Sequence, residues 1–201
     1  MAAANQKKRG YLRGVKGLLI TPLEADGSMP ATPVNYWVDT AQTVSIETEI
    51  VEGESSDLRG GDRVLTRVED DDVIVGANLG FTNARFDAFL TEVIAGGTLI
   101  TEVVETEEQV VGWEAPTIAE QREKIPFQAK VYVQSYNAAG GKEGYLEYEF
   151  RYCKGNAPSV EHGDQEWGTP EFEIKARENP ATGKSVYAKA FVDELPPEAL
   201  E

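Results

Sequence analysis

Hydrophobic and polar residues alternate along much of the chain, most clearly over residues 43–51, 72–81, 127–134 and 144–152. Successive side chains of a strand point to opposite faces of its sheet, so a two-residue period predicts strands with one buried face. Gly140 and Gly141 lie between the last two segments and predict a hairpin turn there. We expect further strands at residues 15–21, 63–68, 99–104, 171–176 and 185–192.

One segment, residues 84–95, has the period of a helix. Its apolar residues recur every three or four positions, which predicts one structural face packed on a sheet. The residues of this expected face are Phe86, Phe89, Leu90, Val93 and Ile94. Thr82 or Asn83 can cap the first turn, and the glycines at 96 and 97 can adopt the left-handed conformation that ends a helix.

One helix among eight or more strands, without alternation of strands and helices, predicts a fold class. We expect a mainly β (α+β) fold, an antiparallel β-sandwich or barrel-like structure with one flanking α-helix. The chain has 201 residues, of which 41% are hydrophobic, enough for the core of one domain. We expect an N-terminal arm over residues 1–13, a single domain over 14–195 and a C-terminal tail over 196–201.

The charge of the chain excludes several functions. It has 35 acidic and 19 basic residues and a formal net charge of −16. Binding to DNA needs Lys and Arg to displace the counterions of the phosphates, and docking on anionic lipid needs the same charge. No apolar run approaches the roughly 20 residues of a membrane helix, and no apolar stretch follows the basic N-terminus as in a signal peptide. We therefore expect no membrane association and no stable nucleic-acid complex.

The sequence offers little for catalysis. Cys153 and His162 are the only residues of their kinds, which excludes an internal disulfide and most zinc sites. The GKS sequence at 183–185 resembles the end of a phosphate-binding loop, but the required earlier glycine is replaced by Glu178, so a turn is favoured. His162 lies among acidic residues without the spacing of a metal motif, and a solvated loop is favoured. We expect no catalytic residue, no cofactor and no metal.

A run of four acidic residues occupies positions 69–72 (EDDD). Calcium loops alternate their carboxylates around a glycine, whereas these four acids are consecutive, so a solvent-facing turn between two strands is favoured. This run ends a longer acidic segment, residues 44–72, which has ten acids and three bases.

Within that acidic segment, residues 52–62 predict a long polar loop. Long loops in compact domains are usually functional. Leu58 can serve as an apolar anchor and Arg59 as a salt-bridge donor to a neighbouring subunit. The candidate contact residues are Glu52, Glu54, Asp57, Leu58, Arg59 and Asp62. The alternative is a flexible hairpin loop without a partner.

Five short segments share a pattern with one family: 38–45 (VDTAQTVS), 52–54 (EGE), 58–62 (LRGGD), 76–83 (GANLGFTN) and 96–98 (GGT). Together they resemble the major tail tube proteins of long-tailed bacteriophages. The resemblance covers residues 10 to 100, and the rest matches mainly as alternating strands with a hairpin. Tubes of contractile tails, tailocins and type VI secretion belong to the same superfamily.

The resemblance implies a structural virion protein rather than an enzyme. Its copies would form homo-hexameric rings that stack into a tail tube, with DNA only as transient, non-specific cargo. Further partners implied are a tape measure protein, a tail terminator, baseplate or tail-tip proteins and, in contractile tails, a sheath. The particle would be assembled in the bacterial host cytoplasm, and the loop at 52–62 would contact the next ring or subunit.

An acidic bore would repel DNA phosphates rather than bind them. The candidates for such lumen-facing acids are Glu47, Glu49, Glu147 and Glu149. The alternative function is a monomeric β-sandwich module for binding or adhesion, carried by a virion or cell-surface particle. Such a module would expose aromatic side chains on one sheet face, for which the candidates are Tyr132, Tyr145, Tyr187 and Phe191.

Overall fold

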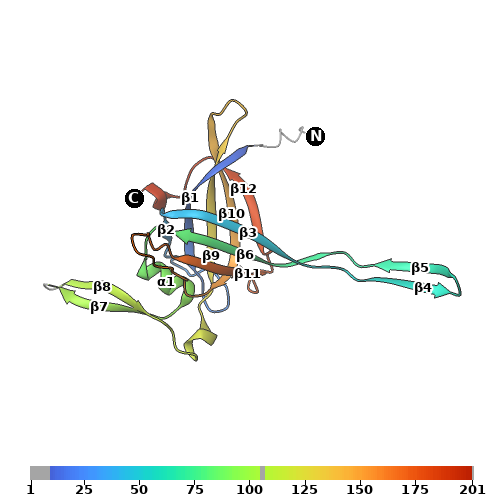
Figure 1. Ribbon diagram of the computed structural model, residues 1–201, viewed down its shortest axis with the longest axis horizontal. Helices are drawn as coiled ribbons and strands as arrows, with labels where there is room; N and C mark the ends of the chain where they lie inside the picture. Colours follow the sequence, from blue (N-terminus) through green and yellow to red (C-terminus); the bar gives the residue numbers. More distant parts are fainter. Residues whose placement is uncertain (1–9, 105–106, 201) are drawn as a thin grey trace.

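The computed structural model of the protein describes residues 10–104 and 107–200 (Figure 1). Eight strands form the main sheet, and every pairing in it is antiparallel. They are β1 (Tyr11–Pro22), β2 (Tyr36–Val38), β3 (Ala41–Val51), β6 (Val73–Asn83), β9 (Phe127–Tyr136), β10 (Lys142–Gly155), β11 (Glu171–Ala176) and β12 (Tyr187–Val192). Their order is β2-β1-β9-β10-β11-β6-β3, with β12 paired to β10.

Strand β10 turns the sheet into two layers by changing partners along its length. It pairs with β12 from Tyr145 to Phe150 and with β11 from Cys153 to Gly155. The register of its pairing with β9 shifts between Phe150 and Cys153, and such bulges bend a strand. Strands β3, β6 and β11 then cross in front of β1, β9, β10 and β12 (Figure 1). The predicted mainly β, antiparallel fold with one helix is confirmed.

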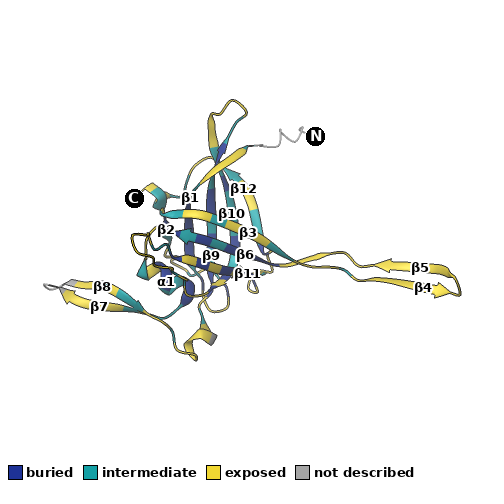
Figure 2. Cartoon of the chain, viewed as in Figure 1, coloured by how far each residue is buried: buried dark blue, intermediate teal, exposed yellow. Residues whose placement is uncertain are grey.

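The core lies between these two layers, on the faces that the two-residue alternation predicted (Figure 2). Its largest fully buried side chains are Phe127, Phe150 and Phe172. Phe172 of β11 stacks on Phe81 of β6, with ring centroids 4.8 Å apart. The hairpin predicted at the glycine pair is also present, because Asn137 donates its backbone N–H to the Gly141 carbonyl across the turn from β9 to β10.

Cys153 lies at the bend of β10 with no exposed surface. Its burial raises the pKa of the thiol far above the ordinary value. The thiolate is the reactive form, and a buried thiol is also inaccessible. We therefore expect Cys153 to be inert toward Ellman's reagent at pH 8 until denaturant is added, as followed by absorbance. Rapid modification of the native protein would show that the two layers open around β10.

Helix α1 (Ala88–Ala95) begins four residues later than predicted. Asp87 is its cap, because the carboxylate accepts a hydrogen bond of 3.1 Å from the Leu90 N–H. Asn83 cannot cap it, since its side chain bonds instead to Thr40 and to the Arg85 carbonyl. The predicted end of the helix is confirmed: Gly96 has a φ of 76° and donates to the Glu92 carbonyl.

The later start of α1 changes which residues of its expected structural face are buried. Leu90 and Ile94 lie in the core, and Val93 is half-buried. Phe86 precedes the helix and is 54% exposed, while Phe89 on its first turn is 45% exposed. The expected core face is therefore wrong for Phe86 and Phe89, whose rings lie at the surface.

Two hairpins leave the body, and the sequence pattern predicted only half of each. They pair β4 (Ser55–Gly60) with β5 (Arg63–Glu69), and β7 (Thr98–Val104) with β8 (Glu107–Glu114). Strands β2, β4 and β8 were not predicted. The short 3-10 helices are η1 (Glu120–Glu123) and η2 (Pro197–Leu200), and η2 lies within the segment expected as a tail. Of the expected N-terminal arm, residues 1–9 lie outside the described residues and Tyr11 begins β1.

Glu198 in η2 accepts a hydrogen bond from the Asn35 side chain, which lowers the pKa of Glu198. The last described residues are thus tied to the loop before β2. Within the described part of the chain, no helix is long and apolar enough to span a bilayer.

Candidate functional site

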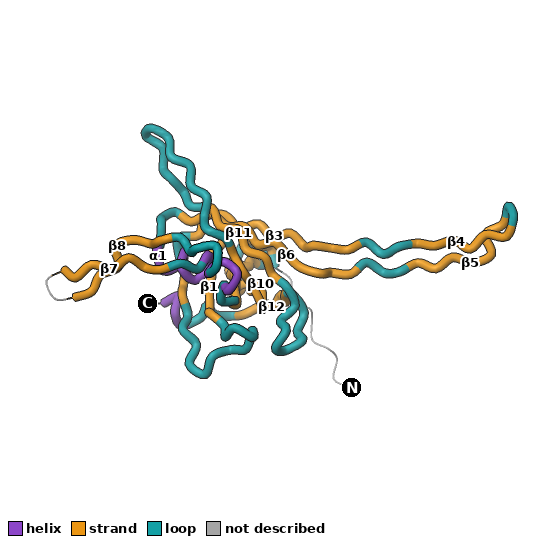
Figure 3. The backbone as a smooth tube through the Cα atoms, turned by 90° about the horizontal axis from the view of Figure 1, so that it is seen from below, coloured by secondary structure: helices purple, strands orange, loops and turns teal. Residues whose placement is uncertain are grey.

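The most prominent feature of the molecule is one long hairpin, here called the arm (residues 50–74). It consists of the end of β3, β4, β5 and the start of β6, and Gly61, with a φ of 64°, forms its turn. Its eleven residues from Ile50 to Gly60 span roughly 35 Å as extended strand. The ribbon and the backbone tube both show the arm projecting from the body with no other element beside it (Figures 1 and 3). The predicted loop at 52–62 is therefore wrong: it is one edge of this arm.

The arm is interrupted halfway, where residues 52–54 face residues 69–72. This interruption holds six acids and no base, and adjacent like charges destabilise strand pairing. Two bonds of 3.0 Å still bridge it, from the Gly53 N–H to the Asp72 carboxylate and from the Asp70 N–H to the Glu54 carbonyl. The turn predicted at residues 69–72 is wrong, because β5 and β6 continue along the same edge of the arm (Figure 1).

The arm exposes apolar side chains that its own fold does not cover. Eight of them are each 51–64% exposed: Ile50, Val51, Leu58, Val64, Leu65, Val68, Val73 and Ile74. Figure 2 shows the arm as exposed along most of its length. A two-stranded hairpin alone is marginally stable in water, and exposed apolar patches mark interaction sites. The arm therefore has an apolar surface that a partner could cover.

The register of β4 with β5 separates two faces of the outer arm. Leu58 lies opposite Thr66, and Ser56 lies opposite Val68, which makes one face uncharged. On the other face Asp57 lies opposite Arg67, 3.5 Å from its Nε. Arg59 is 3.9 Å from the same carboxylate. These ion pairs are exposed, so they add little to stability and stay available to a partner.

The six predicted contact residues all lie on the arm but do not form one surface. Glu52 and Glu54 belong to the interruption, Leu58 lies on the uncharged face, and Asp57 and Arg59 lie on the charged face. Asp62 lies in the turn at the tip. Charge is also distributed unevenly along the arm. Residues 57–67 carry three arginines and two aspartates, whereas the charged residues of the interruption are all acids.

The second hairpin, β7–β8, leaves the body on the side opposite the arm (Figures 1 and 3). It exposes Ile100, Val103 and Val111, and its base is held by a 2.9 Å hydrogen bond from the Trp113 indole to the Gly96 carbonyl. The sequence pattern did not indicate a candidate surface in this hairpin. Its alternation over residues 107–114 is weak, and a glycine interrupts it.

The four acids proposed for the lumen lie on two different faces of the sandwich. Glu47 and Glu49 belong to the outer face of β3, opposite Asn78 and Gly76 of β6. Glu147 and Glu149 belong to the outer face of β10, opposite Tyr132 and Lys130 of β9. Because the core separates these layers, one bore surface can include only one of the two pairs.

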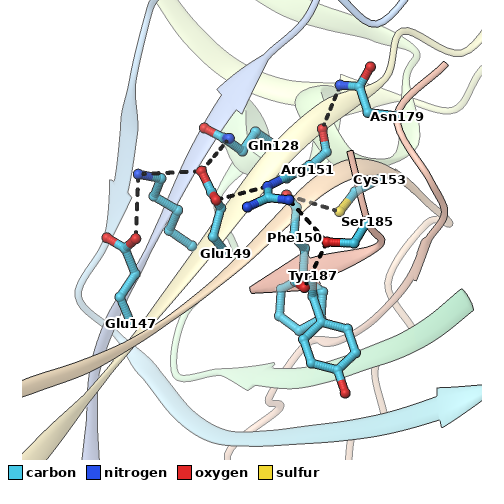
Figure 4. A network of polar contacts seen from close by, with 10 residues as sticks. Gln128, Glu147, Glu149, Phe150, Arg151, Cys153, Asn179, Ser185 and Tyr187 are labelled. Atoms are coloured by element: carbon cyan, nitrogen blue, oxygen red, sulfur yellow. Dashed lines mark hydrogen bonds and ion pairs between the residues drawn. The ribbon is translucent and has the colours of Figure 1, made fainter. Parts of the chain in front are cut away.

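The pair on β10 takes part in a polar network with opposite charges (Figure 4). The Lys130 amine lies 3.6 Å from Glu147 and 3.9 Å from Glu149, and Arg151 donates to Glu149 at 3.0 Å. Gln128 also donates to Glu149 at 3.0 Å. The charges of these two acids and two bases therefore cancel within the network. On β3, Glu49 is paired with Arg177 at 2.8 Å, while Glu47 is exposed.

Tyr132 belongs to the same network rather than to an exposed aromatic surface. It is 3% exposed, its hydroxyl donates to Glu147 at 2.6 Å, and its ring lies 5.7 Å from that of Trp37. Burial, followed by the bond to Glu147, raises the pKa of Tyr132. Tyr145, Tyr187 and Phe191 are half-buried. The aromatic platform expected for the binding-module alternative is therefore not formed by these four residues.

The segments weighed for phosphate and metal sites are turns and loops. Asn179 accepts the Gly183 N–H at 2.8 Å, which closes the turn predicted at the GKS sequence. His162 lies in the exposed stretch between β10 and β11, where Trp167 is 95% exposed. Over residues 10–104 and 107–200, no three His, Cys, Asp or Glu side chains gather as a metal site would require.

No protein-family model matches the sequence, and no curated protein matches it. Solved structures similar over most of the chain include the following two. One is the "Cryo-EM structure of the anti-feeding prophage (AFP) baseplate, 6-fold symmetrised", at 10% identity and a TM-score of 0.32, covering 87% of this chain and 92% of that one. The other is the "Crystal structure of Hcp protein", at 8% identity and a TM-score of 0.34, covering 87% and 99%. TM-scores this low do not establish a shared fold.

Proposed function

We propose that this protein is a structural subunit that assembles with copies of itself through the arm. The observation that carries this proposal is the row of eight exposed aliphatic side chains along a hairpin that projects away from its own body (Figures 1 and 3). Burying apolar area contributes about 25 cal/mol per Å², and only a second surface can bury both faces of the arm. A self-assembling subunit is the role that requires such an element.

The finer proposal is a ring of six copies that stacks into a tail tube, as the sequence resemblance implies. The arm leaves one side of the body, and α1 and β7–β8 lie on the opposite side (Figures 1 and 3). Contacts between two different surfaces join copies head to tail, and they form a closed ring where the rotation closes and a filament where it does not. The presence of two different surfaces on opposite sides of the body therefore supports both rings and stacking.

A tube of this protein would conduct DNA as a transient cargo without binding it. Six copies at −16 each carry −96 per ring, which disfavours adsorption of phosphates. Of the four proposed lumen acids, Glu47 supports this role best, because it is exposed, whereas Glu49 is paired with Arg177. Glu147 and Glu149 are neutralised by Lys130 and Arg151.

In this proposal the protein is not an enzyme, and it belongs to a phage tail or tailocin particle assembled in a bacterial cytoplasm. A tape measure protein, a tail terminator, a baseplate or tail tip and, in contractile particles, a sheath would be its other partners. A monomeric binding module is the weaker alternative, because Tyr132 is buried and does not add to a sugar-stacking surface.

Negative-stain electron microscopy with parallel mass measurement tests the proposal. At high protein concentration we expect hollow rings or tubes with six copies per ring, because mass action drives the burial of the arms. Particles that remain at the 22.0 kDa mass of one chain at every concentration would contradict self-assembly and favour the binding module.

A further inference from the structure

We propose that the arm tip (residues 57–67) of one copy docks in a cavity beside the C-terminal end of α1 in a neighbouring copy. This inference rests on the proposed self-assembly and names the surface that receives the arm.

The cavity lies between the end of α1, η1 and the start of β9, and its volume is about 390 Å³. Its apolar lining includes Val93, Ile125 and Pro126, and its acidic lining includes Glu92 and Glu123. Ile125 is 61% exposed at the rim although it borders this cavity. The cavity therefore suits an occupant that combines aliphatic side chains with positive charge.

The electrostatics of α1 also favour a cation at this position. Backbone carbonyls give the C-terminal end of a helix a partial negative charge, which basic residues in its last turn usually balance. The last turn of α1 has no basic residue. Lys124 lines the cavity, but its amine donates to the Gly155 carbonyl at 2.8 Å and to the Asn156 side chain at 3.3 Å. Among the side chains that the structure describes around this cavity, Lys124 is the one cation, and its amine is already engaged by these two acceptors.

The two exposed phenylalanines lie on or just before α1, whose last turn lines the cavity. Phe89 lies one helical turn before Val93, which lines the cavity, and Phe86 lies just before the helix. Both rings are about half exposed. Aromatic side chains are favoured at the centres of interfaces because they bury a large area. Phe89 therefore places a half-exposed ring one helical turn from the cavity lining.

The arm tip has the matching composition. Leu58 lies on its uncharged face, and the Leu65 side chain approaches Gly60 on the same part of the tip. Arg59 and Arg63 flank the turn, and Arg59 is exposed and only loosely paired with Asp57. Residues 57–67 have three bases against two acids, in contrast to the acidic interruption nearer the body. An aliphatic and basic tip therefore faces an apolar and acidic cavity.

The geometry permits this contact only between copies. The arm projects from one side of the body, and α1 lies on the other (Figures 1 and 3). An arm of roughly 35 Å is long enough to reach onto the surface of an adjacent subunit. Repeating the same contact from copy to copy gives the head-to-tail series that a ring needs.

Disulfide trapping tests the contact. The double variant Asp62→Cys with Glu123→Cys places one thiol at the arm tip and one at the cavity rim, and both positions are exposed. The native thiol of Cys153 is buried and does not compete. Under mild oxidation we expect linked dimers and longer ladders on non-reducing gels, about tenfold more than in the matched control Asp62→Cys with Glu143→Cys, because a disulfide requires close approach.

Electron microscopy of the same variants before oxidation separates this inference from the proposed function. Rings or tubes without a ladder at position 123 would overturn the docking site while self-assembly stands. A protein that neither assembles nor cross-links would overturn both. As an independent readout, Arg59→Glu with Arg63→Glu should prevent assembly, and adding Glu92→Arg with Glu123→Arg should restore it; failure to restore assembly in folded protein would also overturn the docking site.

Discussion

Removing the outer arm should leave a folded protein that no longer assembles. In this variant an Asn-Gly turn replaces residues 52–72 and joins Val51 to Val73. These two valines already lie opposite each other in the ladder of β3 and β6, so a two-residue turn fits their register. The core is formed by other residues and loses nothing.

We expect the arm deletion to change the state of association and not the thermal stability. Sedimentation velocity should give a single monomer at concentrations where the unaltered protein forms rings or tubes. The circular dichroism spectrum and cooperative melting should be retained, because the removed side chains are exposed and contribute no core packing. A variant that polymerises as before would show that the arm is not the assembly element.

Replacing Phe150 by Ala should have the largest effect on folding. Phe150 is fully buried where β10 bends between the two layers, and its ring lies 5.8 Å from that of Tyr187. Truncating a buried phenylalanine removes its transfer free energy and leaves a cavity, which costs about 3–5 kcal/mol. Denaturant unfolding in the arm-deleted background measures this cost without interference from assembly.

Phe89→Ala is the matched control for that experiment. Because its ring is about half exposed, we expect a loss of about 1 kcal/mol or less in the free energy of unfolding. The same change in the full-length protein should weaken assembly, since Phe89 lies one helical turn before Val93, which lines the cavity proposed to receive the arm tip. Equal losses for Phe150 and Phe89 would show that α1 is packed differently in solution.

The sequence predicted those parts of the fold whose strands have one buried face. In β9, Phe127, Ala129 and Val131 are buried on alternate positions, and hydrophobicity follows the same period. In the outer arm only β5 was predicted, and β4 was missed because neither of its faces is buried in one copy. Its Ser55, Ser56 and Gly60 also have low strand propensity, so a hairpin that depends on a partner has the composition of a loop.

The candidate surfaces could be predicted only in part, for two physical reasons. Helical spacing placed Phe89 and Leu90 on one face of the helix. Spacing does not show how much of that face is packed against the rest of the protein, and of these two side chains only Leu90 lies in the core. Strand parity correctly put Glu147 and Glu149 on the outward face of β10. It could not place Lys130 beside both carboxylates, because that contact depends on the register between β9 and β10.

A cryo-electron microscopy map of the assembled protein tests the central claim most directly. We expect density for residues 50–74 of each copy to cross the subunit boundary and lie on a neighbouring copy, with the eight aliphatic side chains of the arm buried there. A map of assembled subunits in which every arm remains free in solvent, or folds back on its own body, would contradict an account in which the arm joins one copy to the next.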